Sequence, residues 1–461
     1  MSYGVASFQT SETRPTWSNA QCAAPAMTLS FTGAAEEPSV RCGTVPPLFS
    51  RQYTGYTFPA RKGNSSMSGR VNLMAPEVRA NPYPVYAELR RSAPVCQVEP
   101  GGLWALTRFE DVSAAFKNPQ VFSSAGVRTV TAPPWLGHNP FSESMIVMDP
   151  PHHMRLRTLV SRAWTPTAVN RMEPRIRGFA QHLAERLQPE REVDFVDAFA
   201  MPLPASVIGE LFALDPQMTA RYKRWSVDLS SVSGTTEKDT HRHESIRATV
   251  REMEDYLSQV VADRRRQPQE DMVSDLVQTR VDGEALSDAE LMSFLFLLVV
   301  AGLETTVQLV SHCVRMLMEH PHLLTRLREN PAQLPRFVEE VLRFEPSVHG
   351  LVRVTTKETE VSGVVIPAGA RVALMVGSAC RDGERFKDPD TFDMDREGVN
   401  NFPFGHGIHF CLGAPLARLE ARVGLEVLLS RFTKFTPTGP VKWNTSLTVR
   451  GPLTMPLIPH A

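Results

Sequence analysis

Apolar residues recur at helical spacing along most of the chain from Val71 to the C-terminus. The strongest pattern begins at Ser287, which forms a capping box with Glu290 ahead of an apolar run. This pattern continues to His320, a length of about 50 Å at the rise of an α-helix. Its middle, residues 294–303, is apolar on every side, which is typical of a helix buried in a large core. Shorter helices are predicted at residues 82–91, 155–163, 172–188, 244–266, 335–344 and 414–432.

Alternation with a period of two is confined to short segments. Strands are predicted on either side of two Pro-Gly turns, at residues 95–98 with 103–107 and at 360–366 with 371–376. Residues 122–148 contain prolines and glycines without a clear period, which predicts a long loop of the kind that is usually functional or mobile. The pattern as a whole predicts a mainly α fold with a minor β-sheet region.

Residues 1–70 differ from the rest of the chain. They are rich in Ser, Thr, Ala and Pro, carry few charges and show no sustained period, which predicts a disordered N-terminal extension. A second interpretation places the true start at Met67, which leaves 461 − 66 = 395 residues. In either case residues 71–461 are expected to form the functional domain.

Composition limits the functions that the chain can have. With 49 basic and 50 acidic side chains, the net charge of −1 gives no general attraction to nucleic acid or to an anionic membrane. No wholly apolar stretch approaches the roughly 20 residues that span a bilayer. The N-terminus lacks the layout of a secretory signal. The six cysteines contain no CxxC pair, which disfavours a disulfide framework, a zinc ribbon and an iron–sulfur cluster. We expect a cytoplasmic protein without membrane insertion and without a nucleic-acid partner.

Candidate chemistry is concentrated in residues 404–413, immediately before the last predicted helix. Three glycines in ten residues indicate a backbone that turns sharply or lies against something flat. Cys411 lies one or two residues before the helix, where free N–H groups and the helix dipole favour the thiolate that ligates metals. On residue types alone, a Gly-rich turn with a buried cysteine is an equal alternative.

The same residues match the pattern Phe-Gly-x-Gly-x-His-x-Cys-x-Gly at all six fixed positions. They resemble the cysteine-ligand loop of the cytochrome P-450 haem-thiolate monooxygenases, and residues 414–420 resemble its soluble bacterial branch. The resemblance implies that Cys411 is the axial iron ligand of haem b. Phe404 would pack beside the ligand, Gly405 would belong to the haem-contacting loop, and His409 would reach a haem propionate. The haem would lie between the long central helix and the cysteine-ligand loop with the C-terminal helix.

Residues 301–306, in the middle of the long helix, contain an acid followed by two threonines. An unpaired Glu buried there would cost several kcal/mol, so a purpose is expected, although a solvated Glu beside a kink is the plainer interpretation. The segment resembles the family's oxygen-binding groove. By that likeness Thr305 hydrogen-bonds the bound dioxygen, Glu304 relays protons, Gly302 leaves space for dioxygen, and Ala301 contacts the cofactor.

Two further segments resemble the family. Residues 149–157 contain an Asp-Pro-Pro-x-His-x-x-x-Arg pattern, by which His153 and Arg157 would neutralise a haem propionate. Arg353 matches a further propionate partner. The adjacent histidines at 152 and 153 are not a convincing metal pair, because neighbours on a helix point about 100° apart.

A pair of opposite charges three residues apart, Glu340 and Arg343, is usually an ordinary surface ion pair. Here it resembles the family's Glu-x-x-Arg, which forms a buried structural triad with a later arginine, identified as Arg396. We expect these three residues to support the cysteine loop rather than to take part in chemistry.

The function implied is a monooxygenase that uses O2 to hydroxylate or epoxidise a hydrophobic small molecule. No flavin or iron–sulfur motif is visible, so electrons are expected from a separate ferredoxin and ferredoxin reductase, or a flavodoxin-type donor, with NAD(P)H used only indirectly. Four arginines are candidates for a basic docking face, although ordinary solvated arginines explain them equally well; they are Arg155, Arg162, Arg418 and Arg422.

Rival functions remain open at this level. They are a peroxide-driven peroxygenase, a non-oxygenating haem enzyme on the same fold, and a haem sensor or idle scaffold. Terpenoid, steroid, fatty acid and polyketide substrates are equally compatible with the sequence. The expected pocket residues are Val130, Trp135, Leu298, Ala301, Val348, His349 and Leu351.

Overall fold

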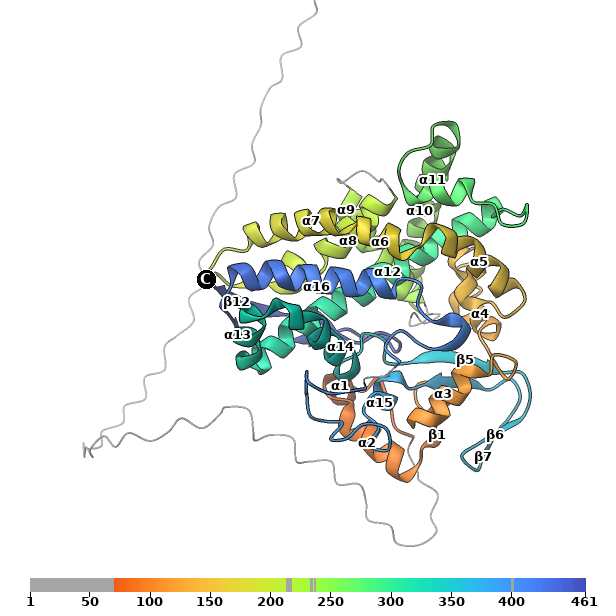
Figure 1. The fold of residues 1–461 in the computed structure, drawn as a ribbon. Helices are drawn as coiled ribbons and strands as arrows, with labels where there is room; N and C mark the ends of the chain where they lie inside the picture. The colour runs from red at the N-terminus through yellow and green to blue at the C-terminus, as the bar shows by residue number, and fades with distance from the viewer. Residues whose placement is uncertain (1–69, 213–217, 233–234, 236–237, 399–401) are drawn as a thin grey trace, which may run out of the picture. The chain divides into compact units, whose positions relative to one another are not determined.

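The computed structural model describes residues 70–212, 218–232, 235, 238–398 and 402–461. Apart from Arg70, the predicted N-terminal extension lies outside the described residues. The described part of the chain is mainly helical with small sheets, as the sequence predicts. Figure 1 shows the longer helices in its upper half, and the main sheet with the first helices at the bottom.

The central element is α12, Asp288–Glu319. Its predicted capping box is confirmed, because the Ser287 hydroxyl accepts from the Glu290 N–H and the Glu290 carboxylate accepts from the Ser287 N–H. By length and composition α12 is the one described helix that could cross a membrane, but 67% of its most apolar window is buried in the molecule. The helix is therefore explained as the core of the fold.

Several helices pack around α12. They include α8 (Pro202–Leu211), α9 (Thr219–Ser230), α14 (Leu334–Phe344) and α16 (Ala414–Arg431). The other α-helices are α1 (Pro76–Ala80), α2 (Tyr83–Ser92), α3 (Phe109–Lys117), α4 (Arg128–Thr131), α5 (His152–Ala163), α6 (Pro166–Arg171), α7 (Glu173–Arg186), α10 (Thr240–Arg266), α11 (Met272–Gln278), α13 (Pro321–Glu329) and α15 (Val376–Ala379).

The main sheet has five strands in the order β1-β2-β8-β5-β3. Its strands are β1 (Val95–Val98), β2 (Leu103–Leu106), β3 (Phe122–Ser123), β5 (Leu351–Thr355) and β8 (Arg371–Leu374). The predicted β1–β2 hairpin is present, and β8 joins β2 in parallel. The predicted strand at 360–366 is instead a small hairpin of two strands, β6 (Thr359–Val361) and β7 (Val364–Ile366).

The C-terminal part adds two smaller sheets. The order β4-β12-β9 joins β4 (Val193–Asp194), β9 (Lys434–Pro437) and β12 (Pro456–His460). A two-stranded ladder joins β10 (Lys442–Trp443) to β11 (Pro452–Thr454). The turn between β10 and β11 reaches back to the N-terminal helix α1 and to α12, as described below.

The segment predicted as one long loop is more structured than its sequence suggests. Besides β3 and α4 it contains three short 3-10 turns: η1 (Ala125–Val127), η2 (Pro140–Glu143) and η3 (Met145–Val147). η2 packs on α12, and the Trp135 ring stacks on His243 of α10 with 4.0 Å between ring centroids. Single turns lack enough residues to produce a visible period, which is why the pattern predicted only a loop.

Candidate functional site

The segment that contains Cys411 forms a closed loop leading into α16. The Cys411 N–H donates to the Phe404 carbonyl over 2.9 Å, which closes the loop. Gly405 and Gly407 both have a φ of 70°, a region that side chains rarely adopt. At Gly407 a Cβ atom would also lie 2.7 Å from the carbonyl oxygen of Phe116 at the end of α3. Glycine is therefore needed at position 407 for both conformation and packing.

Burial raises the pKa of the Cys411 thiol above its ordinary value, and four groups oppose that rise. The backbone N–H groups of Gly413 and Ala414 donate to the sulfur, while the guanidinium groups of Arg157 and Arg418 act on it electrostatically. N–H groups at the start of a helix carry the positive end of its dipole. The loop thus favours a thiolate once a cation binds to the sulfur.

Four predicted anion-binding residues from distant segments lie close together. The rings of His153 and His409 are 4.2 Å apart between centroids. Burial, followed by repulsion from Arg353, His153 and Arg157, lowers the pKa of His409 to about 3. Such repulsion requires the three groups to be near the His409 ring. The tertiary structure therefore gathers this predicted set at one place.

His409 differs from the other residues of this set because its ring already forms hydrogen bonds with protein groups. Its Nε2 lies 3.0 Å from the Ser124 hydroxyl, and the ring also hydrogen-bonds the Met148 carbonyl. The Ser124 N–H in turn donates to Asp149 over 2.8 Å. By contrast, His153 is 1% exposed and neither of its ring nitrogens has a partner among the described residues. His153 is thus better suited than His409 to bind an added anion.

The residues present fit a haem group better than a bare metal ion. No cluster of three or more His, Cys, Asp or Glu side chains in the described residues could hold such an ion. His152 is exposed whereas His153 is buried, so the adjacent histidines do not share a ligand. A haem would bring its own ring nitrogens and carboxylates. Cys411 would then supply a ligand to the iron, and His153, Arg157 and Arg353 would neutralise the carboxylates.

The predicted oxygen-activation residues lie in a continuous part of α12. The Thr305 hydroxyl donates to the Ala301 carbonyl over 2.6 Å, which fixes its hydrogen and leaves its lone pairs free to accept. Ala301 is exposed in the protein structure. Gly302 has a packing role that the sequence did not suggest, because a Cβ atom there would lie 2.9 Å from Ile208 Cδ1 on α8. Its missing side chain lets α8 approach α12.

Glu304 has partners that sequence reasoning missed. Asn444 Nδ2 donates to Glu304 Oε1 over 3.3 Å, and the Ser230 side chain of α9 also hydrogen-bonds the carboxyl group. Burial raises the pKa of Glu304, and these two hydrogen bonds partly offset the rise. Neither partner lies in a recognisable motif, and Asn444 is 140 residues away in the chain. No local sequence signal could have found them.

Glu340, Arg343 and Arg396 form one buried ion-pair cluster. Arg343 makes a two-pronged contact to the Glu340 carboxylate at 2.7 and 2.8 Å, and Arg396 Nε lies 3.4 Å from the same carboxylate. Arg343 also donates to three backbone carbonyls, those of Cys380, Pro389 and Thr391. The cluster therefore ties α14 to the segment that precedes the cysteine loop.

The predicted pocket residues do not all lie together. Leu298 and Ala301 are one turn apart on α12. Val130 is half-buried on α4, and Trp135 is held against His243 by stacking. Of these, the α12 residues and Val130 are compatible with a pocket, whereas the Trp135 ring is occupied by its contact with α10.

His349, one of the expected pocket residues, lies in the core of the described structure. His349 is 1% exposed, with its ring nitrogens 3.5 Å and 3.4 Å from the hydroxyls of Tyr83 and Tyr86. A Cβ atom on Gly377 would lie 2.8 Å from the His349 ring, so the absence of a side chain there makes room for the imidazole. Burial lowers the pKa of His349 well below its ordinary value. His349 is a neutral core residue.

Its neighbours on and before β5 face other parts of the molecule. Leu351 contacts the cysteine loop, where its Cδ1 is 4.0 Å from the position of a Cβ on Gly405. Val348 forms a β-bridge with Val449. Val348 and Leu351 thus lie next to two different segments, the turn between β10 and β11 and the cysteine loop.

Comparisons by sequence find similar proteins over most of the chain. A family model described as "Cytochrome P450" matches residues 75–455. The chain is 38% identical over 370 residues to cytochrome P450 107B1 of Saccharopolyspora erythraea, covering 78% of this chain and 89% of the relative. It is 39% identical over 350 residues to the erythromycin C-12 hydroxylase of the same species, covering 76% and 86% respectively.

A solved structure gives the same result for the fold. The structure of cytochrome P450 CYP109Q5 from Chondromyces apiculatus superposes with a TM-score of 0.79 at 37% sequence identity. The match covers 85% of this chain and 98% of that one. The similarity thus extends over the helical part, the sheets and the cysteine loop together.

Proposed function

The chain belongs to the cytochrome P450 family of monooxygenases, and on that basis we propose that Cys411 holds haem b for the hydroxylation or epoxidation of a bulky apolar substrate. The observation that carries the proposal is the cysteine loop, in which the sulfur receives two backbone N–H groups at the start of α16. Haem, when bound, supplies the iron at which dioxygen is activated. His153, Arg157 and Arg353 would neutralise its carboxylates.

In this proposal Glu304 and Thr305 take part in proton delivery. Burial raises the pKa of Glu304, so its carboxyl can hold a proton closer to neutral pH than an exposed Glu does. The Thr305 hydroxyl donates to the Ala301 carbonyl, which leaves its oxygen able to accept a hydrogen bond from the reacting side. Oxygen activation needs a supply of protons, whereas some other haem reactions do not. The acid Glu304 next to the ordered hydroxyl of Thr305 therefore supports oxygen activation.

Electrons would come from a separate ferredoxin and its reductase, or from a flavodoxin-type donor, with NAD(P)H oxidised only by the reductase. The arginines considered for docking are largely compensated by carboxylates. Arg155 pairs with two glutamates, as does Arg422, and Arg418 pairs with one. A docking surface that depends on these three charges is therefore disfavoured, while exposed Arg162 stays a candidate.

The substrate class that we propose is a macrocyclic polyketide-type product. The support is the name of one relative, a hydroxylase of erythromycin, at 39% identity. Substrate binding to the haem protein is measurable as a spin-state shift in the Soret region. We expect macrolide-type compounds to give such shifts at lower concentration than steroids or fatty acids of similar apolar area; the reverse order would exclude this substrate class.

The first test is the carbon monoxide difference spectrum of the dithionite-reduced protein. We expect the strongly red-shifted Soret band of thiolate-ligated haem, and its complete loss in Cys411→Ala. Cys96→Ser is the matched control, because Cys96 is a half-buried free cysteine outside the site and its replacement should leave the band unchanged. A less shifted band in the unmodified protein would contradict thiolate ligation.

Turnover then separates the monooxygenase from the peroxygenase. With surrogate ferredoxin and reductase we expect product formation that depends on O2 and reductant, with one labelled oxygen atom incorporated from 18O2. Product that forms with peroxide alone, and none with the redox proteins, would favour the peroxygenase.

A further inference from the structure

The turn between β10 and β11 carries Asn444, a buried amide that contacts the proton-handling acid of α12. Asn444 is 9% exposed, and its Nδ2 lies 3.3 Å from Glu304 Oε1. Its Oδ1 accepts from Arg79 Nη2 over 2.8 Å and from the Gly451 N–H over 3.4 Å. One amide therefore joins α1, α12 and the C-terminal ladder.

These neighbours fix which end of the amide faces Glu304. A guanidinium group and a backbone N–H can only donate, so the oxygen of Asn444 must face Arg79 and Gly451. The NH2 group is then directed at Glu304, where it can only donate to the carboxyl oxygen. The orientation follows from the donor and acceptor inventory of the site.

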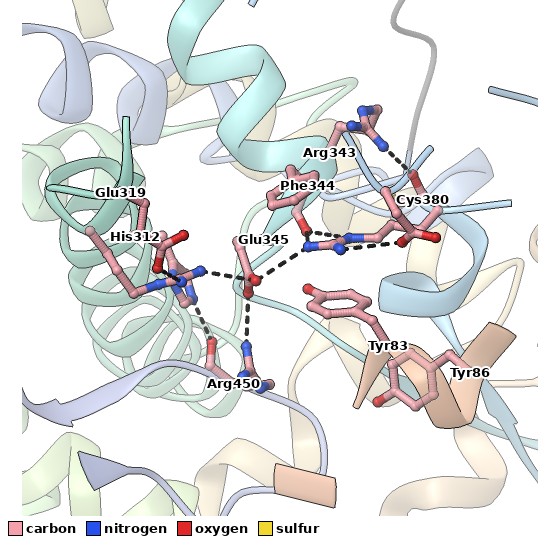
Figure 2. A network of polar contacts seen from close by, with 12 residues as sticks. Tyr83, Tyr86, His312, Glu319, Arg343, Phe344, Glu345, Cys380 and Arg450 are labelled. Atoms are coloured by element: carbon pink, nitrogen blue, oxygen red, sulfur yellow. Dashed lines mark hydrogen bonds and ion pairs between the residues drawn. The ribbon is translucent and has the colours of Figure 1, made fainter. Parts of the chain in front are cut away.

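Arg79 is itself held firmly on the far side of Asn444. It is 7% exposed and also donates to the backbone carbonyls of Asn444 and Val449. Its own carbonyl accepts from Arg450 Nε over 3.1 Å. Arg450 continues to Glu345 at 2.8 Å, in the buried network of Figure 2. The amide is thus anchored to a rigid part of the core.

Few other groups act on the Glu304 carboxyl. Among the described residues, the groups that influence it apart from burial are Ser230 of α9 and Asn444, and both are uncharged. The hydrogen bonds of Asn444 lead from Glu304 to one charged group, the guanidinium of Arg79, which lies on the opposite side of the amide. A neutral change at Asn444 should therefore alter the environment of Glu304 without changing the charge around it.

We propose that Asn444, oriented by Arg79, is a positioning residue for Glu304, holding one carboxyl oxygen in place and setting how readily the group keeps its proton. The proposal rests on the role of Glu304 given under the proposed function. Donation to the carboxyl favours its ionised form, so Asn444 makes Glu304 release a proton more readily than burial alone would allow. Without that donor the Glu304 side chain would be less fixed in position. Its carboxyl would also be a weaker acid and would release its proton less readily.

The variant that tests this is Asn444→Asp in the full-length holoenzyme. It preserves size and strengthens the contact with Arg79, so folding should be retained, while the donor toward Glu304 becomes an acceptor. Infrared difference spectroscopy during a pH titration reports the protonated Glu304 carbonyl band, identified by its loss in Glu304→Gln. Loss of the donor and repulsion from the new carboxylate both favour the protonated form, so we expect the midpoint of this band to rise by about one pH unit or more in N444D. In the neutral variant Asn444→Ala, which removes the donor without adding a charge, we expect a smaller rise in the same direction, and an unchanged midpoint there would overturn the proposal.

A second readout follows the reaction. In N444D we expect at least a tenfold fall in product formed per electron pair consumed, with the pH optimum displaced upward and substrate affinity within about twofold. Ser446→Ala is the matched control from the same turn, because the Ser446 hydroxyl contacts only Thr448 and the Val449 N–H among described residues. It should change neither the titration nor the coupling.

The outcomes separate the inference from the proposed function. An unchanged Glu304 midpoint in N444D, with a normal thiolate-type carbon monoxide spectrum, overturns the positioning role and leaves the function standing. A shifted midpoint in a protein without that spectrum supports the contact while the proposed function fails. A shifted midpoint together with lost coupling supports both.

Discussion

At the end of α14 a single carboxylate, Glu345, is shared by three arginines. Ion pairs join it to Arg315 at 2.9 Å, Arg381 at 3.3 Å and Arg450 at 2.8 Å, and Figure 2 shows Glu345 at the centre of this network. Burial alone would raise the pKa of Glu345, but the surrounding cations outweigh it and hold the pKa well below its ordinary value. Among the described residues Glu345 is the one carboxylate partner of Arg450, whereas the second partners of the other two arginines are more exposed.

Replacing Glu345 by Gln should lower the free energy of unfolding by about 3–5 kcal/mol at pH 7, because it leaves buried cations uncompensated. A depressed carboxyl pKa contributes stability above the unfolded-state value of 4.5, and this is lost as pH falls. The difference between wild type and E345Q should therefore shrink below about pH 4.5. Urea denaturation at pH 7 and pH 4 measures both effects.

Glu319→Gln is the control for this prediction. Glu319 also pairs with Arg315, but its side chain is 47% exposed, so its ion pair should contribute below about 1 kcal/mol. If E319Q and E345Q lower the free energy of unfolding equally, burial of the carboxylate does not decide how much its ion pairs stabilise the protein.

At the scale of elements, the cysteine loop depends on Gly407, which is needed for both its backbone conformation and its close packing. Gly407→Ala would place a Cβ 2.7 Å from the Phe116 carbonyl oxygen at a φ of 70°. Gly137 has a φ of 71° with nothing within 4 Å of its Cβ position, so Gly137→Ala isolates the backbone effect. We expect the strained backbone to lower the free energy of unfolding by about 1–2 kcal/mol in both variants. In G407A the clash with Phe116 should lower it by roughly a further 1–3 kcal/mol.

Thermal unfolding compares the stabilities, and the carbon monoxide spectrum reports the loop itself. G407A should lose part of the thiolate-type band, whereas G137A should keep all of it. If both variants lose equal stability and retain the band, the contact with Phe116 has no role in forming the ligand loop.

Elements with long periodic patterns were predictable, and those without were not. The capping box at Ser287 and the apolar stretch 294–303 suffice to predict α12, because helix ends and buried faces are local properties. α8, which packs on Gly302, was not predicted, and neither were the short turns of residues 122–148. α8 and η2 both pack on α12, a contact with a distant part of the chain that no local window contains.

At the scale of the whole molecule, the match to the family model begins after the first 66 residues, because the model matches residues 75–455. All three clusters of buried apolar side chains consist of residues from Leu73 onward. A chain beginning at Met67 should therefore melt within about 2 °C of the full-length protein and give the same carbon monoxide spectrum. A fall in Tm of about 5 °C or more would contradict this, because it would require stabilising contacts from the removed segment.

The sequence by itself determined the class of fold, and it identified the candidate ligand cysteine and the acid–alcohol pair of α12. These depend on residues that are adjacent in the chain: the Phe404–Gly413 pattern, the start of a helix after Cys411, and Glu304 followed by Thr305. Their roles were predicted from the resemblance to cytochrome P-450 motifs, which a sequence shows directly because each motif spans only a few consecutive residues.

Only the tertiary structure decided which distant groups complete the site. It brought Asn444 to Glu304, placed His349 between two tyrosines rather than in a pocket, and engaged His409 with Ser124. The physical reason is that hydrogen bonds and burial depend on distance in space, and these partners are separated by 140 to 285 residues. No periodicity connects positions so far apart, so their contacts exist only once the chain has folded.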